Sequence, residues 1–274
     1  MTANPAFHFD ESKVWAAFAQ AAPRVHIEHI DSCSSTNTLL LERAAQGAHS
    51  GLVLVTDEQT AGKGRQGRRW ISTPDYSLTF SLLWIFPDGG ALSGLSLAVG
   101  VAIARGLEDL GIEGIALKWP NDIWLSGRKL GGVLIEVLFS ESRAAVVIGI
   151  GLNLRRNPAW DEIVDQPLAA IDDARKPIPR EQVLGAVLLR LQEKLDAFAA
   201  GGFAAVRAEW DARNALADQW VRVESQAGEQ VGLCIGSAAN GALEIQDEQG
   251  QRHHVTAGDV GLKVRPLSPP YISP

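Results

Sequence analysis

The sequence predicts an α+β protein in which a central mixed-sheet domain is followed by a small β-barrel domain. Hydrophobic residues make up 46% of the 274 residues and charged residues 21%, which provides enough apolar surface for a packed core. Strand-like and helix-like segments alternate up to about residue 214, whereas only short strand-like segments follow residue 220. We therefore expect an N-terminal extension over residues 1–24, a central domain over 25–216 and a C-terminal domain over 217–274.

Helices are expected where apolar residues recur at helical spacing. The second helix can be capped by Ser35 or Thr36 and ended by Gly47, residue types that favour those positions. The expected helices are residues 10–22, 36–46, 92–107 and 180–214.

Apolar runs of strand length predict the central sheet. A hairpin-like segment, residues 123–129, connects the run that ends at Lys118 to the next one. The expected strands are residues 25–30, 52–56, 78–86, 115–118, 130–139 and 144–154.

The C-terminal part contains short strands separated by turn residues. The pair Asn240-Gly241 is a strong hairpin signal. The close strand spacing is consistent with a small barrel of about 50 residues. Its expected strands are residues 221–224, 230–235, 242–246 and 253–256.

Composition excludes several classes of protein. A net charge of −7 and a pI near 5.4 argue against broad nucleic-acid binding. The apolar runs are too short to span a bilayer, and the N-terminus lacks the basic and apolar regions of a signal peptide. Cys33 and Cys234 lie far apart without a Cys-x-x-Cys motif, so neither a disulfide framework nor a zinc site is expected. We expect a cytoplasmic protein without a membrane partner.

The most informative segment is residues 62–70, Gly-Lys-Gly-Arg-Gln-Gly-Arg-Arg-Trp, called here the basic loop. Cations at this density repel one another unless an anion joins them, and glycines let the backbone approach that anion. The pattern predicts a loop that binds a phosphate or carboxylate; a solvated surface loop is the alternative. Its glycines match the dinucleotide fingerprint, but Pro74 and a strand-like run leave no room for the required helix. A Walker A loop is excluded because Arg68 and Arg69 replace the lysine and the hydroxyl.

A second candidate segment begins where a strand ends at Lys118. A proline two residues later forbids central continuation of that strand, so Asn121 and Asp122 are expected in a turn, facing a ligand or metal. Lys129 starts an apolar strand, where partial burial would make it a strong point charge toward an anion. A lysine whose stem packs in an ordinary hairpin is the alternative. Gly132 would allow a ligand to pass closely.

Two further segments can contribute to a site. Glycines 149 and 151 alternate on one face of a strand-like run that ends at Asn153, and either a flat ring or a closely packed strand could lie there. The side chains of Ser35, Thr36 and Asn37 either cap a helix or exchange hydrogen bonds with a polar ring.

Together these segments resemble the biotin protein ligase family. The matching motifs, in the family's order and approximate spacing, are residues 35–37, 59–70, 118–122, 128–132 and 149–153. The resemblance covers about residues 25–268 and combines two specific motifs, the basic loop and Lys118-Trp119-Pro120-Asn121-Asp122. It implies a central domain of the class II synthetase-like type and an SH3-like C-terminal domain.

The resemblance also implies a reaction. ATP and biotin, with Mg²⁺, would give biotinyl-5'-AMP, and biotin would then pass to a lysine of a biotin carboxyl carrier domain in a biotin-dependent carboxylase. A lipoate-protein ligase shares the fold and the lysine chemistry, and a non-catalytic biotin-binding regulator is an alternative from another class. The basic loop and the predicted barrel favour biotin.

Site residues follow from the same resemblance. Lys129, Arg65 and Arg68 would be catalytic, offsetting the repulsion between carboxylate and phosphate. Trp70 and Trp119 are interpreted as core or loop anchors. The biotin-binding residues would be Ser35, Thr36, Asn37, Gln59, Lys63, Gly64, Arg65, Lys129 and Gly132. The ATP-binding residues would be Arg68, Lys118, Asn121 and Asn153, with Asp122 as a magnesium ligand.

The sequence departs from the family pattern at three points. Lys63 stands where the family loop has its first arginine, so charge is retained but bidentate geometry is lost. Gly131 replaces the usual alanine, a minor change. Only about 24 residues precede the first expected strand, too few for the winged-helix domain of some members. We therefore expect a form without that domain and without operator DNA as a partner.

Overall fold

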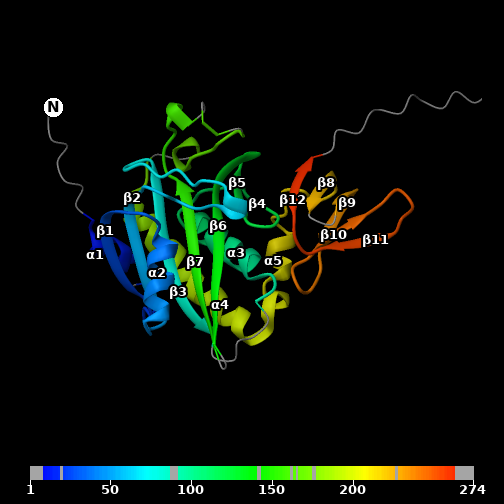
Figure 1. Cartoon of the computed structure of the whole chain (residues 1–274). Helices are drawn as coiled ribbons and strands as arrows, with labels where there is room; N and C mark the ends of the chain where they lie inside the picture. Colours follow the sequence, from blue (N-terminus) through cyan, green and yellow to red (C-terminus); the bar gives the residue numbers. More distant parts are fainter. Residues whose placement is uncertain are drawn as a thin grey trace, which may run out of the picture.

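The computed structural model describes residues 9–18, 21–86, 92–140, 143–160, 163–164, 166–174, 177–225 and 228–262. Two β-sheets dominate the arrangement, a large mixed one and a smaller one near the C-terminus (Figure 1). The described helices lie mainly against the large sheet.

The large sheet has seven strands in the order β1-β2-β3-β7-β6-β5-β4. The pair β1–β2 is parallel, and each other neighbouring pair is antiparallel, so the expected mixed sheet is confirmed. Their bounds are β1 His26–Cys33, β2 Leu52–Gln59, β3 Ser77–Phe86, β4 Ile115–Lys118, β5 Asp122–Leu125, β6 Arg128–Ser140 and β7 Arg143–Asn153.

Alternating side chains give the large sheet two apolar faces. Val53 and Val55 of β2 belong to the main core, which α3 and α4 cover, whereas Leu54 packs with Leu40 of α2 on the opposite face (Figure 1). The helices are α1 Glu11–Trp15, α2 Thr36–Ala45, α3 Leu95–Asp109, α4 Arg180–Gly201 and α5 Arg207–Asp211. Short 3-10 turns are η1 Ala16–Phe18, η2 Arg65–Gly67, η3 Pro158–Trp160, η4 Ile171–Asp173 and η5 Gly202–Ala205.

The smaller sheet is antiparallel, with five strands in the order β11-β10-β9-β8-β12. It packs on the central domain, because its buried residues belong to the main core and the Trp119 indole donates a hydrogen bond to the Gly241 carbonyl at 3.0 Å. A side chain on Gly241 would lie 2.6 Å from the backbone of Gly94, so this approach requires glycine. The strands are β8 Trp220–Ser225, β9 Gly228–Ser237, β10 Leu243–Gln246, β11 Arg252–Val255 and β12 Asp259–Leu262.

Differences from the expected elements are local. The hairpin-like segment contains a separate strand, β5, and a further short strand, β12, ends the described chain. The helix expected over residues 180–214 breaks at Gly202, whose φ of 61° lies in the left-handed region. The domain boundary expected at residue 216 lies between α5 and β8, before the first strand of the smaller sheet. Separate folding of the two parts stays a prediction.

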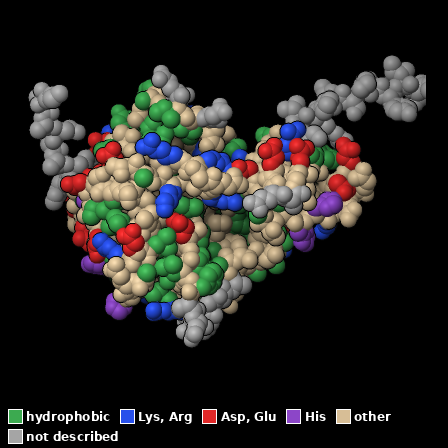
Figure 2. All heavy atoms as spheres, viewed as in Figure 1, with side chains coloured by type: hydrophobic (Ala, Val, Ile, Leu, Met, Phe, Trp, Pro, Cys, Tyr) green, Lys and Arg blue, Asp and Glu red, His purple; other side chains and the backbone are tan. Residues whose placement is uncertain are grey.

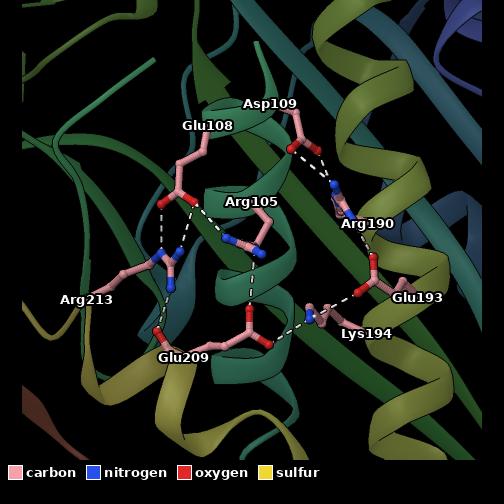
Figure 3. A network of polar contacts seen from close by, with 8 residues as sticks. All are labelled: Arg105, Glu108, Asp109, Arg190, Glu193, Lys194, Glu209 and Arg213. Carbon is pink, nitrogen blue, oxygen red and sulfur yellow. Dashed lines mark hydrogen bonds and ion pairs between the residues drawn. The ribbon is translucent and has the colours of Figure 1, made fainter. Parts of the chain in front are cut away.

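An ion-pair network connects the helices behind the large sheet (Figure 3). Glu108 of α3 accepts two hydrogen bonds of 2.8 Å from Arg213, and Arg190 of α4 pairs with Asp109. The Arg213 carbonyl accepts a hydrogen bond of 2.7 Å from the Leu117 amide of β4. The network therefore fixes the segment that connects the two sheets. The remaining members are Arg105, Glu193, Lys194 and Glu209.

Replacing Glu108 should destabilise the protein in a pH-dependent way. Hydrogen bonds from Arg213 hold the pKa of the Glu108 carboxyl below its usual range. The stabilisation is therefore present above the unfolded pKa of about 4.3 and is lost as the pH falls through the lower folded pKa. We expect Glu108→Gln to reduce the free energy of unfolding by about 1 kcal/mol at pH 7 and by less at pH 3.5, measured in urea.

The control is Glu113→Gln, which removes an exposed carboxylate outside the network. A deficit in Glu108→Gln that is the same at both pH values would contradict the assigned role of the charge.

Candidate active site

A cavity of about 1250 Å³ lies where the two sheets meet, and residues of both sheets line it. Figure 2 shows lysine and arginine side chains gathered near this junction. Every site residue expected from the sequence lines the cavity: Ser35, Thr36, Asn37, Gln59, Lys63, Gly64, Arg65, Arg68, Lys118, Asn121, Asp122, Lys129, Gly132 and Asn153.

One end of the cavity is polar and buried. Ser35, Thr36, Asn37 and Gln59 are each at most 7% exposed, although all carry hydrogen-bonding side chains. The amide and hydroxyl of Thr36 donate to Gln59 Oε1 at 2.8 and 3.1 Å, and Ser81 Oγ lies within 2.7 Å of Thr36 Oγ1. Such a network holds its members in fixed orientations, since breaking it would leave buried polar groups unpaired.

Glu136 and Ser81 lie outside the sequence motifs, and both form hydrogen bonds with Asn37 at the polar end. The Asn37 amide donates to Glu136 Oε2 at 2.8 Å, and Asn37 Oδ1 lies 2.6 Å from Ser81 Oγ. Ser35 precedes α2 in an extended conformation and makes no side-chain capping bond to the described helix. The capping interpretation is therefore not supported for Ser35, which lines the cavity.

The basic loop folds back on itself. Lys63 and Arg69 form an antiparallel bridge, and the Gly64 amide donates to the Arg68 carbonyl at 2.7 Å. Gln66 and Gly67 form the turn with positive φ angles of 55° and 75°. This geometry directs the loop's arginines toward two different neighbours.

Those neighbours belong to different parts of the fold, the turn after β4 and strand β12. Arg65 donates to Asn121 Oδ1 at 3.3 Å, whereas Arg68 forms an ion pair with Asp259 of β12. Burial lowers the pKa of Arg65, and the Asp259 carboxylate opposes this effect. An arginine stays charged at any physiological pH, so Arg65 provides a desolvated cation.

Lys129 provides a second partly buried cation. Its ammonium lies 2.8 Å from Asp122 Oδ1, and the two side chains are 16% and 15% exposed. A bulge between Ile123 and Trp124 sets the register of β5 and β6, placing Trp124 opposite Lys129 and Asp122 opposite Gly132. The expectation of a partly buried lysine at this strand start is confirmed.

Lys118 and the two asparagines are held by nearby groups. The Lys118 ammonium lies 5.1 Å from the centre of the Trp124 ring, and burial lowers its pKa, opposed by the charges of Asp122 and Asp259. The Asn121 amide donates to the Val133 carbonyl at 2.8 Å. The Asn153 amide donates to the Ala169 carbonyl at 2.9 Å, so it fixes a neighbouring segment as well as lining the cavity.

Side chains of the protein cover Gly149 and Gly151, the two glycines on one face of β7. A side chain on Gly149 would lie 2.3 Å from Asn37, and one on Gly151 would lie 2.3 Å from the Trp70 ring. Of the two interpretations, a flat ring or close packing, close packing therefore applies at Gly149 and Gly151. Gly132 differs, because a methyl group there would meet nothing closer than Asp122 at 3.5 Å, leaving room on the cavity side.

The described residues of the cavity do not form a preformed magnesium site. Asp122 is paired with Lys129, and Mg²⁺ bound by one carboxylate needs phosphate oxygens and water to complete its shell. Among the described residues, the one group of metal-ligand type is His29, Asp31 and Asp57. Arg180 already forms an ion pair with Asp57, which places a cation at that group. Neither place fits a metal held by the protein alone.

Some cavity residues were missed because they carry no local signal. Arg222, Glu224 and Asp259 belong to the smaller sheet and reach the cavity only through tertiary packing. Further lining residues come from the segment after η3, and Ile163 among them is 66% exposed: Trp160, Ile163, Val164, Gln166 and Leu168. None of the described helices combines the length and the hydropathy that crossing a membrane requires.

Comparison with known proteins identifies the family. A model of the Biotin/lipoate A/B protein ligase family matches residues 29–153. The chain is 34% identical over 241 residues to the Biotin--[acetyl-CoA-carboxylase] ligase of Mycobacterium tuberculosis, covering 85% of this chain and 88% of the relative. It is 31% identical over 216 residues to the Bifunctional ligase/repressor BirA of Escherichia coli, covering 78% and 67%.

A solved structure agrees with these sequence relatives. The biotin protein ligase from Aquifex aeolicus in complex with biotin and ATP matches with a TM-score of 0.75 and 28% identity, covering 87% of this chain and 98% of that chain. A second one, the Biotin Acetyl Coenzyme A Carboxylase Synthetase from Helicobacter pylori, shares the fold at 23% identity and a TM-score of 0.58. From its fold, its cavity and these relatives, the chain belongs to the biotin/lipoate A/B protein ligase family, among the biotin–protein ligases.

Proposed function

We propose that this enzyme activates biotin with ATP as biotinyl-5'-AMP and transfers biotin to one lysine of a biotin carboxyl carrier domain. The observation that carries the proposal is that one cavity is lined both by buried hydrogen-bonding groups and by cations. A molecule with a polar ring and a carboxylate fits both sets of groups. The acceptor class is supported by the name of the Mycobacterium tuberculosis relative, a Biotin--[acetyl-CoA-carboxylase] ligase.

The polar end suits the ureido ring of biotin, which has two N–H donors and one carbonyl acceptor. Ser35, Thr36, Asn37 and Gln59 offer both donors and acceptors. The network with Ser81 orients the last three before the ligand arrives. Gly132 leaves space for the chain of the ligand beside Lys129. A preoriented polar site loses little freedom on binding and discriminates by hydrogen bonding.

The cationic end suits the first chemical step. A carboxylate oxygen of biotin attacks the α-phosphorus of ATP, and the bond to pyrophosphate breaks. Two anions must approach one another, so Lys129 and Arg65 offset their repulsion as charge develops in the transition state. Asp122 holds Lys129 and Asn121 holds Arg65, which keeps both cations in place. Magnesium would enter with the ATP phosphates, as part of the substrate, and Asp122 would face it.

The second step transfers the acyl group. The neutral amine of the acceptor lysine attacks the acyl carbon of the mixed anhydride, the carbon–oxygen bond to AMP breaks, and the amine loses a proton. Lys129 and the loop arginines stabilise the charge on the departing AMP. Arg68, Lys118, Asn121 and Asn153 would complete the surroundings of the nucleotide, and Lys63 and Gly64 those of biotin; all of them line the cavity. We expect these events to take place in the cytoplasm.

Biotin is favoured over lipoate as the acid. A dithiolane ring has no hydrogen-bonding groups of comparable strength. It would exclude water from the polar end without supplying hydrogen bonds, at a cost of about 1–3 kcal/mol for each group that loses a partner. We therefore expect exchange of labelled pyrophosphate into ATP that depends on biotin. Equal exchange with lipoate, or exchange without any acid, would contradict the proposed substrate; wild-type protein heated to unfold it serves as the blank.

Lys129→Ala should slow adenylation on the order of 10²–10³-fold, the scale expected for one preorganised charge at a developing anion. The readout is biotin-dependent pyrophosphate exchange, with the melting temperature measured in parallel. Lys13→Ala is the control, because Lys13 is exposed and lies outside the cavity. Exchange at the wild-type rate in Lys129→Ala would make this lysine a structural residue only.

Thr36→Val tests the polar end while preserving the shape of the side chain. Losing the hydroxyl removes one link between Gln59 and Ser81, so biotin binding should weaken about 10-fold or more. Isothermal titration with biotin alone measures this effect. The matched control is Thr60→Val at an exposed threonine that does not line this cavity. The polar end has no direct role if both variants bind biotin equally well.

A further inference from the structure

The contact between Arg68 and Asp259 connects the basic loop to the smaller sheet. The two residues are 191 positions apart in the sequence, and both line the cavity. Their side chains are 56% and 45% exposed, and ion pairs this open to water contribute little to overall stability. The Arg68–Asp259 ion pair therefore matters for the position of the basic loop rather than for the stability of the fold.

Asp259 is the better fixed of the two partners. It begins β12, which pairs with β8 in a register that places Asp259 opposite Glu224 and Val260 opposite Val223. Val260 and Val223 are buried in the main core, so the strand carrying the carboxylate is anchored. The loop carrying Arg68 is held instead by hydrogen bonds within itself and by the contact of Arg65 with Asn121.

The charge of Asp259 also acts on the other cations of the cavity. Its carboxylate favours the charged forms of Arg65 and Lys118 and opposes the lowering of their pKa values, whereas Arg68 disfavours those forms. Asp259 thus counters the repulsion among cations that the loop brings to the cavity.

We propose that Asp259 is a positioning residue that holds Arg68 at the cavity and so docks the basic loop onto the smaller sheet, closing the site around the nucleotide. This role rests on the proposed function, because the benefit of a docked Arg68 is a phosphate contact. An arginine already held by Asp259 has several N–H donors left for a phosphate oxygen. Without Asp259 the guanidinium must be ordered when ATP binds, which weakens binding in the ground state and the transition state alike.

Tryptic cleavage of the loop tests docking without any reference to activity. Trypsin cuts after the lysine and arginines of residues 62–70 only when the backbone opens locally. We expect Asp259→Asn to be cut several-fold faster than wild type without ligand, and Asp259→Glu to be cut at nearly the wild-type rate. Glu224→Gln is the matched control, because Glu224 lies opposite Asp259, lines the same cavity and makes no ion pair with the fully described loop. Equal cleavage rates for Asp259→Asn and wild type would overturn the proposal.

Exchange kinetics test the consequence for the nucleotide. We expect Asp259→Asn to raise the KM for ATP about 10-fold with kcat changed less than about 2-fold, since uniform binding is lost. In an Arg68→Ala background the same substitution should have a much smaller effect, because only the action of Asp259 on Arg65 and Lys118 remains. A lower KM in Asp259→Asn would show that Asp259 competes with phosphate, and a full effect in the Arg68→Ala background would show that it acts elsewhere; either result overturns the proposal.

The two measurements separate the hypotheses. If wild-type protein shows no biotin-dependent exchange, the proposed function fails, and the tryptic rates still decide whether Asp259 docks the loop. If exchange is present and the tryptic rates are equal, the docking role alone fails.

Discussion

The site depends on holding like charges together in a partly buried cavity. Arg65, Lys118 and Lys129 lose water there, and they repel one another. The protein offsets this with two carboxylates, Asp122 beside Lys129 and Asp259 beside Arg68. The result is a cavity whose cations are partly neutralised by the protein's own carboxylates and can still receive an anion.

The architecture follows from that constraint. The turn between β4 and β5 and the start of β6 bring Lys118, Asp122 and Lys129 to one edge of the large sheet. The start of α2 supplies the polar end on the same face of the large sheet as Asp122, where uncharged groups stay buried by bonding to one another. Two chemically different ends thus arise from one sheet, and the smaller sheet closes the space between them.

The sequence predicted the parts of the site that carry local signals. The density of charge and glycine in the basic loop, and the proline that ends a strand after Lys118, required only short-range rules. Glu136 and Asp259 could not be predicted in this way, because their roles depend on strand register and on packing between distant segments. β5 overlaps the segment interpreted from the sequence as a hairpin turn, and β12 forms by pairing with β8, which lies more than 30 residues earlier in the chain. The break at Gly202 was missed because the apolar spacing continues on both sides of it.

The hydrogen bond from Trp119 to Gly241 has a mechanical consequence. Trp119 lies between Lys118 and the turn that carries Asn121, so the segment that lines the cavity is also the segment that contacts the smaller sheet. A rotation of one sheet relative to the other would shift these side chains directly, without an intervening linker. The position of the smaller sheet and the positions of Lys118 and Asn121 in the cavity are therefore coupled through this segment.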